Sequence, residues 1–171
     1  MTCPIDAEQL GRLLDEHGAA LALYASQWTD SPDDCVQEAL VELAQQRERP
    51  QHIRAWLYRV VKNRALNMLR GDKRRRERES HAMAARFALV QGSAGHDRGD
   101  SLAAIEAVGR LNDAEREIVV MRIWGGLRYE DIAAALGISA STAFRQYERA
   151  LVKLRQILEK PCSTTNRQNR D

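Results

Sequence analysis

Cysteine is scarce in this sequence of 171 residues, and its distribution excludes the frameworks that cysteine builds. The chain has three cysteines, Cys3, Cys35 and Cys162, which lie far apart and form no CxxC pair. An odd number at such spacing argues against both a disulfide framework and a zinc site. We interpret Cys35 as a small core residue and the other two as free thiols near the ends of the chain.

Motifs of catalysis are also missing. The sequence contains no HExxH, no GxSxG and no Walker-type GxxxxGK[ST] segment. Its four histidines, His17, His52, His81 and His96, are scattered. His17 fits the inner or flanking side of a helix, where a satisfied core histidine is commoner than a metal ligand. We therefore expect no enzymatic activity, no metal and no cofactor.

Long apolar runs are absent as well. No stretch approaches the roughly 18 apolar residues of a membrane span, and no basic segment leads into an apolar stretch as in a secretory signal. Hydrophobic residues make up 44% of the chain, which is normal for a soluble globular protein. The expected location is the cytoplasm.

Charge is distributed unevenly along the chain. Residues 1–48 hold ten acidic side chains and two basic ones, whereas residues 62–78 hold eight basic and two acidic ones. Such polarity indicates two different partners, one of them a polyanion.

Apolar residues at helical spacing predict three helices in the first half. The first runs from about Asp6 to about Gln27. The second begins after Ser31, a possible N-cap, with Pro32 in the first helical position, and ends near residues 47–50. The third carries its apolar side chains on one side: Ile53, Trp56, Leu57, Val60, Val61, Ala65, Met68 and Leu69.

The following segment predicts a division into two domains. Residues 91–100 contain three glycines and read as a flexible tether, after a weak helix at 81–90. We expect an all-α fold of two small helical domains, spanning 1–79 and 101–160, joined by a linker over 80–100. A disordered tail should follow at 161–171, where the chain has nothing to bury.

Local signals also divide the second half into helices. Leu102 to Leu111 predict a short helix, and Asn112 with Glu115 resembles a capping box that opens the next one. Gly125-Gly126 should end that helix. Gly137 offers the positive φ of a sharp turn, and Ser139 can cap the last helix.

Residues 129–154 form the pattern of a helix-turn-helix, with the turn at 136–138. Ala133 is small enough for the two helices to cross closely, while Ile132, Ile138, Ala143 and Tyr147 fill the crossing. A basic helix is more often an ordinary solvated surface, but the preceding helix and glycine turn favour DNA binding. The outward side chains that could contact phosphates and bases are Ser141, Thr142, Phe144, Arg145, Glu148, Arg149 and Lys153.

Three segments in order resemble one family. SPDDCVQEALVEL and IRAWLYRVVKNRALNMLR are similar to region 2 of the extracytoplasmic-function sigma factors, and residues 111–155 are similar to their region 4. The resemblance implies a sigma factor that binds core RNA polymerase, recognises the minus-35 and minus-10 promoter elements and helps melt the DNA. It also implies regulation by an anti-sigma factor.

The resemblance assigns roles to residues in both halves. Asp34, Gln37 and Glu38 match positions that face polymerase, and their spacing places them on one helix face. Without the resemblance, an ordinary solvated face would be the commoner interpretation. The minus-35 contacts are expected from Ser141, Thr142, Phe144, Arg145, Arg149 and Lys153.

The third helix is expected to bind the minus-10 strand. Asparagine amides can recognise the edge of an unstacked base while cations hold the backbone of a separated strand. By resemblance, the loop before this helix and Asn63 hold a flipped base. Trp56 falls on the apolar stripe and is expected in the core, whereas Tyr58 stays open as a stacking residue. The strand-binding residues are Arg59, Lys62, Asn63, Asn67, Arg70 and Arg74.

Two departures from the family pattern bear on these expectations. Phe144, Arg145 and Gln146 replace a basic residue, a serine and an arginine found in many relatives, so their minus-35 preference does not transfer to this chain. Arg128 stands where relatives often have a Ser or Thr cap.

The alternative is a helix-turn-helix regulator that binds DNA without joining polymerase, its acidic half serving for dimerisation or sensing. A purely structural helical protein would not explain Arg145 and Arg149 facing outward after a glycine turn.

Overall fold

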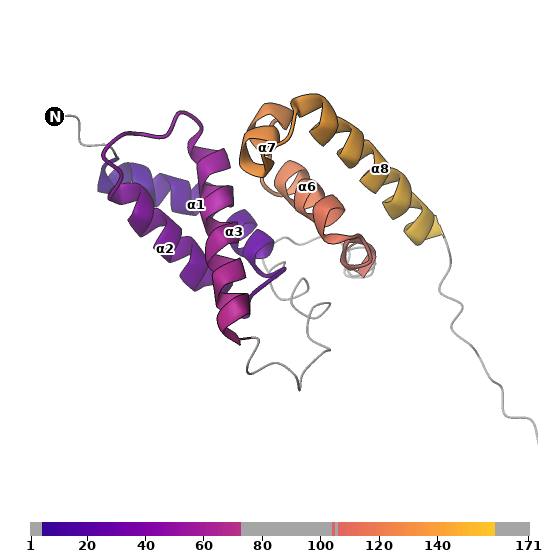
Figure 1. Cartoon of the computed structure of the whole chain (residues 1–171), viewed down its shortest axis with the longest axis horizontal. Helices are drawn as coiled ribbons and strands as arrows, with labels where there is room; N and C mark the ends of the chain where they lie inside the picture. Colours follow the sequence, from indigo (N-terminus) through magenta and orange to yellow (C-terminus); the bar gives the residue numbers. More distant parts are fainter. Residues whose placement is uncertain (1–4, 73–103, 105, 160–171) are drawn as a thin grey trace, which may run out of the picture.

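The computed structural model describes residues 5–72, 104 and 106–159, and every regular element in them is helical (Figure 1). This confirms the predicted all-α class. The predicted linker, the weak helix at 81–90, the tail and Arg74 lie outside the described residues. The helices are α1 (Ala7–Ala25), α2 (Pro32–Ala44), α3 (Ile53–Asp72), α6 (Asp113–Ile123), α7 (Tyr129–Leu136) and α8 (Ala140–Glu159).

The first two helices begin where the sequence predicts. Asp6 is the N-cap of α1, and its carboxylate accepts a hydrogen bond from the Gln9 N–H at 2.7 Å. Ser31 precedes α2 as expected, but its side chain makes no capping bond. That part of the prediction is wrong because the Ser31 backbone, with ψ of 62°, does not adopt the extended conformation of a capping residue.

Helices α1 to α3 form a bundle around large apolar side chains. Leu21, Leu43 and Val61 are almost completely buried, and Cys35 is fully enclosed, which confirms its predicted core position. Trp56 is half-buried at the edge of this core. Tyr58 is 1% exposed and packs edge-on against Tyr24, with 5.0 Å between ring centroids.

The second half starts with a helical stretch at residues 106–109 that leads into a capping box. The Asn112 side chain accepts from the Glu115 N–H at 2.9 Å, and Glu115 accepts from the Asn112 N–H at 3.3 Å. Both bonds of the predicted motif are present. Gly126, with φ of 59°, lies in the turn after α6.

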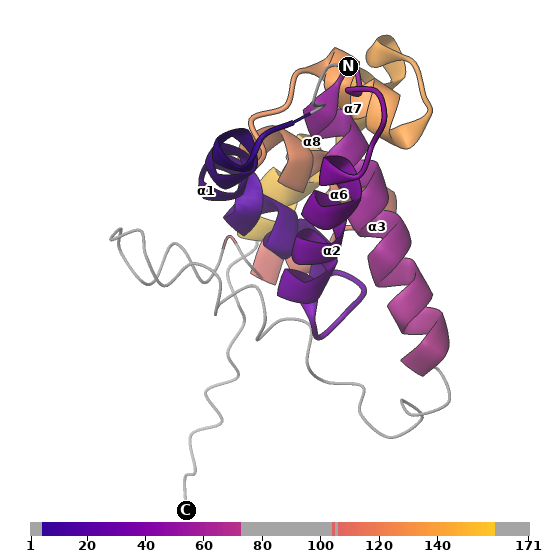
Figure 2. The same cartoon turned by 90° about the vertical axis from the view of Figure 1, so that its left-hand side faces the viewer.

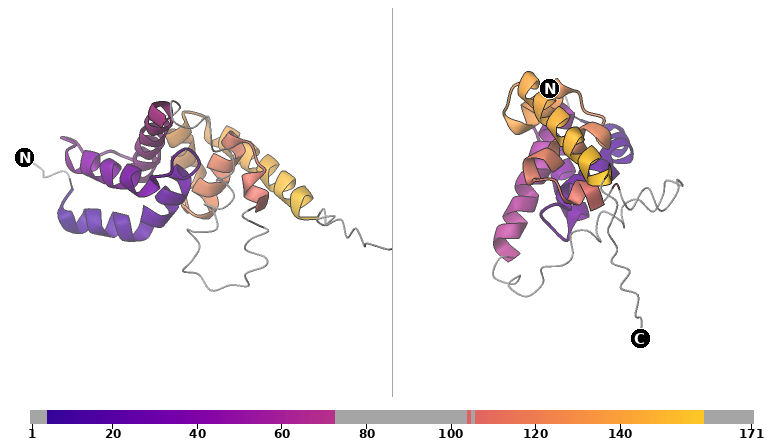
Figure 3. Two further views of the ribbon diagram at one scale, coloured as in Figure 1. Left: turned by 90° about the horizontal axis from the view of Figure 1, so that it is seen from below. Right: turned by 90° about the vertical axis from the view of Figure 1, so that its right-hand side faces the viewer.

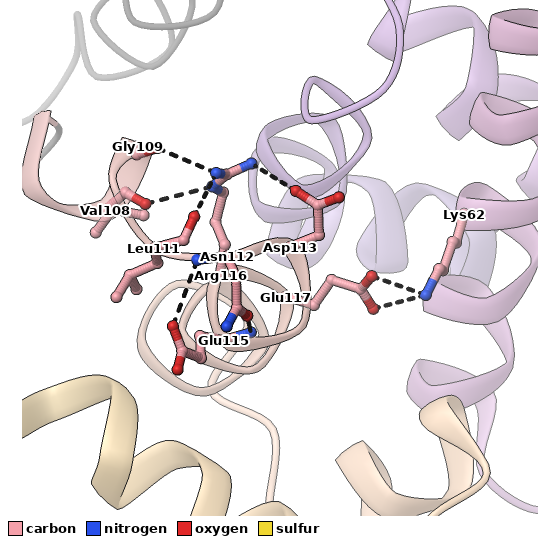
Figure 4. A network of polar contacts seen from close by, with 9 residues as sticks. All are labelled: Lys62, Val108, Gly109, Leu111, Asn112, Asp113, Glu115, Arg116 and Glu117. Carbon is pink, nitrogen blue, oxygen red and sulfur yellow. Dashed lines mark hydrogen bonds and ion pairs between the residues drawn. The ribbon is translucent and has the colours of Figure 1, made fainter. Parts of the chain in front are cut away.

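Arg116 is a buried cation whose hydrogen bonds connect two helical segments of this half, and the sequence did not predict this role. Its guanidinium donates to the backbone carbonyls of Val108, Gly109 and Leu111, at 3.3, 3.1 and 2.6 Å (Figure 4). Carbonyls at a helix end lack partners within the helix. Arg116 therefore joins the end of the 106–109 stretch to α6.

The two halves of the chain lie side by side, α1–α3 on one side and α6–α8 on the other (Figures 1 and 3). Helix α3 packs against α7, and α1 packs against α6. One hydrophobic cluster includes buried residues of both halves, among them Leu23, Val61, Ile118 and Leu127. Figure 2 shows the same arrangement from the side of α1 and α2. Within the described ranges, no helix is long and apolar enough to cross a membrane.

His17 on α1 should make stability depend on pH. Its side chain is 17% exposed, and burial, followed by the positive charge of Arg54, lowers the pKa of the imidazole. The unfolded chain therefore binds this proton at higher pH than the folded chain, so the free energy of unfolding should fall as pH drops from about 7.5 to about 5.5. Chemical denaturation across this range should show the fall in the wild type and a smaller one in His17→Gln. Equal slopes for the two proteins would contradict the assignment.

Candidate nucleic-acid interface

The helix-turn-helix is built from α7, a glycine turn and α8. Helix α7 ends at Gly137, whose φ of 70° is left-handed, and the Ile138 N–H donates back to the Ala133 carbonyl at 3.1 Å. The Ser139 hydroxyl then accepts from the Thr142 N–H at 3.1 Å and caps α8. The structure thus confirms the expected roles of Gly137 and Ser139.

The crossing of α7 and α8 depends on small and fully buried side chains. Ile132 and Ala143 are 0% exposed, and Ala133 is 8% exposed. Ile138 and Tyr147 are partly buried against the same core. The packing leaves the opposite side of α8 facing outward, as expected.

The outer face of α8 presents most of the predicted DNA-binding residues together. Ser141, Arg145, Glu148 and Arg149 are exposed, and Thr142 is half-buried beside the Ser139 cap. Two of the predicted residues also contact other parts of the protein. Phe144, though 46% exposed, packs edge-on against Tyr129 with 5.3 Å between ring centroids, and Lys153 forms an ion pair with Glu115 of α6.

A second polar face runs along α3. Arg59, Asn63, Asn67 and Arg70 are all exposed there, and Arg70 donates to the Asn67 side-chain oxygen at 3.3 Å. Lys62 does not join them, because it is turned toward the second half and bonded to Glu117. Tyr58 is buried between the halves and is not available for stacking in this conformation.

A groove lies at the start of α3, where resemblance places a flipped base. It combines an aromatic side chain with cations and polar groups, and α7 contributes Ala134 to its wall. The sequence indicated the loop and not the α7 contribution, because α7 is distant in the chain. The lining residues are Gln46, Glu48, Arg49, Pro50, Gln51, His52, Ala55, Trp56, Arg59 and Ala134.

The predicted polymerase-facing residues form one exposed patch on α2. Asp34, Gln37 and Glu38 are all exposed and line a shallow groove between α2 and α3. Val41 lies in the same groove and is 56% exposed. Arg64 of α3 pairs with Glu38 at 3.2 Å and with Glu42 at 2.7 Å across it. The sequence could have placed Val41 in this patch, because it lies four residues after Gln37 and three after Glu38 and so shares their helix face.

These features define a helical protein with a helix-turn-helix, an exposed polar face on α3 and a separate exposed patch of acidic and polar side chains on α2. Comparison with known proteins places that class in a family. A family model described as Sigma-70 region 2 matches residues 13–75, and one described as Sigma-70, region 4 matches residues 101–154.

Individual relatives give the same result. The ECF RNA polymerase sigma factor EcfG of Rhodopseudomonas palustris (strain TIE-1) is 29% identical over 146 residues, which is 81% of this chain and 77% of EcfG. The structure of CnrH in complex with the cytosolic domain of CnrY is similar with a TM-score of 0.57 and 27% identity, covering 90% of both chains. The sigma factor RpoE in complex with the anti-sigma factor NepR from Bartonella quintana shares the fold, with a TM-score of 0.60, 20% identity and coverage of 88% and 96%.

The chain belongs to the sigma-70 family and, within it, to the extracytoplasmic-function (ECF) sigma factors. It is an RNA polymerase sigma factor that directs promoter-specific initiation, and it is not itself an enzyme. Residues 13–75 correspond to region 2 and residues 101–154 to region 4.

Gly137 should be required for the turn because of its backbone conformation alone. A Cβ at this position would meet nothing within 4 Å, but φ is 70°. Gly137→Ala should therefore lower the free energy of unfolding by about 1–2 kcal/mol, measured by chemical denaturation. Gly11→Ala is the matched control, since Gly11 also has open space around it but lies inside α1, where alanine is favoured. An unchanged stability of Gly137→Ala would contradict the argument.

Proposed function

We propose that α8 recognises the minus-35 element by inserting its outer face into the major groove. The exposed pair Arg145 and Arg149, presented after the Gly137 turn, is the observation that carries this proposal. Arginine can bond the O6 and N7 atoms of guanine, and hydroxyl groups such as those of Ser141 and Thr142 can hold phosphates. Phe144 supplies an apolar contact, and Lys153 joins once it leaves Glu115.

Helix α3 and the groove at its start are proposed to bind the minus-10 element. Asn63 and Asn67 can recognise the edges of unpaired bases, while Arg59, Lys62, Arg70 and Arg74 hold the separated strand. The exposed row on α3 and the groove containing Trp56 and Arg59 support this. By binding the separated strands in a sequence-dependent way, the factor would help melt the promoter.

The exposed patch of Asp34, Gln37 and Glu38 is proposed to dock on core RNA polymerase. Exposed acidic side chains around Val41 combine charge with an apolar centre, as interfaces commonly do. Acidic groups would also steer the patch toward a basic partner surface.

We further infer that the domains are 1–79 and 101–160, with the linker at 80–100 and the tail at 161–171. The family matches, which fall within these limits, support the division. By analogy with RpoE, whose structure holds the anti-sigma factor NepR, an anti-sigma protein is a proposed partner. The cytoplasm, where core polymerase works, is the proposed location.

Replacing arginines on α8 should weaken promoter binding. Arg145→Ala and Arg149→Ala should each lower the affinity for a promoter fragment about fivefold or more, because a bidentate base contact contributes roughly 1–3 kcal/mol. Gel shifts would be run with and without core polymerase on a promoter selected by run-off transcription from a genomic library. Arg155→Ala is the control, since Arg155 is exposed on α8 but lies beyond the proposed contacts.

The same gel shifts separate two modes of action. A sigma factor should bind well only with core enzyme, which sets the spacing of its two DNA-binding halves. Tight binding by the protein alone, unchanged by core polymerase, would indicate a regulator that acts without polymerase.

Removing the Asp34 charge and the Gln37 amide from the α2 patch should weaken association with polymerase and leave the fold intact. Asp34→Asn combined with Gln37→Ala should lower affinity for core enzyme about tenfold, or roughly 1.4 kcal/mol, as expected for interface residues whose truncation costs more than about 1 kcal/mol, while the thermal midpoint stays near that of the wild type. Affinity would be measured by fluorescence anisotropy. Asp15→Asn removes an exposed carboxylate from α1 and serves as control. Equal affinities for the double variant and the control would overturn the docking assignment.

A further inference from the structure

Glu117 of α6 is a buried carboxylate whose charge is balanced from the other half of the chain. Its side chain is 7% exposed. Lys62 of α3 donates to both carboxylate oxygens, at 2.7 and 2.8 Å (Figure 4). The hydroxyl of Tyr24 in α1 donates to the same carboxylate at 3.2 Å. Both partners therefore lie in region 2, while Glu117 lies in region 4.

Asp131 of α7 repeats this arrangement at a second point. Its side chain is 5% exposed, and Arg54 of α3 lies 3.5 Å away. The ring of His52, just before α3, is at 3.4 Å, and Arg128 of its own half is also at 3.4 Å. At both points the acid comes from region 4 and a cation of region 2, Lys62 or Arg54, lies against it.

Between these two points, the turn that connects α6 and α7 packs closely against α3. A Cβ on Gly125, in the turn between α6 and α7, would lie 2.3 Å from the Tyr58 hydroxyl. That hydroxyl is buried and, among the described residues, has no hydrogen-bond partner. A buried hydroxyl without a partner disfavours closure, since opening would return it to water. The ion pairs of Glu117 and Asp131 must therefore outweigh the free-energy cost of burying the Tyr58 hydroxyl if the two halves are to stay together.

Closure covers part of the surface proposed to bind DNA. Lys62, which should hold the minus-10 strand, is occupied by Glu117. Ala134 of α7 lies against the groove that contains Trp56 and Arg59. Carboxylates on these cations stand where phosphates would bind, because both anions offer paired oxygens to the same donors.

We propose that Glu117 and Asp131 form an intramolecular latch that keeps the free sigma factor closed, with their carboxylates occupying cations that bind strand phosphates once region 4 moves away. Arg54 and His52 then join Lys62 as phosphate-binding residues of region 2. Closure and minus-10 strand binding exclude each other. This inference rests on the proposed strand-binding role of α3.

The closed state can be tested with charge-neutral variants of the full chain. Glu117→Gln combined with Asp131→Asn should enlarge the radius of gyration measured by small-angle X-ray scattering. Glu115→Gln is the matched control, because Glu115 lies on the same helix but pairs with Lys153 of its own half. Enlargement confined to the double variant supports the latch, and equal scattering from the double variant and the wild type overturns it.

A charge swap distinguishes the loss of a specific ion pair from a general loss of stability. Lys62→Glu alone should open the protein, and adding Glu117→Lys should restore compactness by remaking the pair in reverse. Failure of the second change to restore compactness, with the helix content of both proteins intact by circular dichroism, contradicts a specific latch.

DNA binding provides the second readout. The affinity of the free protein for a labelled single-stranded oligonucleotide of mixed sequence should rise roughly tenfold in the Glu117→Gln and Asp131→Asn double variant, a typical coupling between sites. The gain should disappear when Lys62→Ala is added and shrink as salt increases. An opened variant with unchanged affinity would overturn the masking of a DNA site.

Failure here is distinguishable from failure of the proposed function. If the latch is wrong, the wild type still directs run-off transcription with core polymerase and the α8 variants still lose promoter binding. If the DNA-binding role is wrong, Lys62→Ala has no effect on oligonucleotide affinity even in the opened protein.

Discussion

The pairing of buried carboxylates with cations from the other half determines how the two parts of this chain meet. A carboxylate as enclosed as that of Glu117 must be balanced locally, since an unpaired buried charge is strongly destabilising. The balancing groups, Lys62 and Tyr24, come from two helices of region 2. The contact is therefore specific for one arrangement of the halves, and it decides which side of α3 remains exposed.

The glycine turn and two small side chains set the angle and the distance between α7 and α8. The left-handed Gly137 sets the angle at which α8 leaves the turn, and the small Ala133 and Ala143 let it cross close to α7. These constraints lie within region 4, so its outer face keeps its shape whether or not the halves touch. The orientation of that face relative to α3, by contrast, depends on contacts between regions.

The sequence predicts much of the local structure because its signals are local. The first helix begins at about Asp6 as expected, and Asn112, Gly137 and Ser139 adopt their expected roles through bonds to residues three positions away or, for Gly137, through its own φ. Ser31 did not, because its backbone, with ψ of 62°, lies outside the extended conformation that a capping side chain needs. Apart from the half-buried Thr142, the proposed binding residues on α2 and α8 are exposed as expected, since the amphipathic pattern separates their buried and outward faces.

The sequence by itself determined the helices, the helix-turn-helix and the family, because these depend on short-range periodicity and on motifs in a fixed order. Only the tertiary structure decided the partners of individual charges. Lys62 and Glu117 are 55 residues apart, and Tyr24 and Glu117 are 93 apart. The burial of Tyr58, the role of Arg116 and the pairing of Lys153 with Glu115 likewise depend on packing. No periodicity encodes such contacts, because they arise when whole helices pack and bring distant side chains within bonding distance.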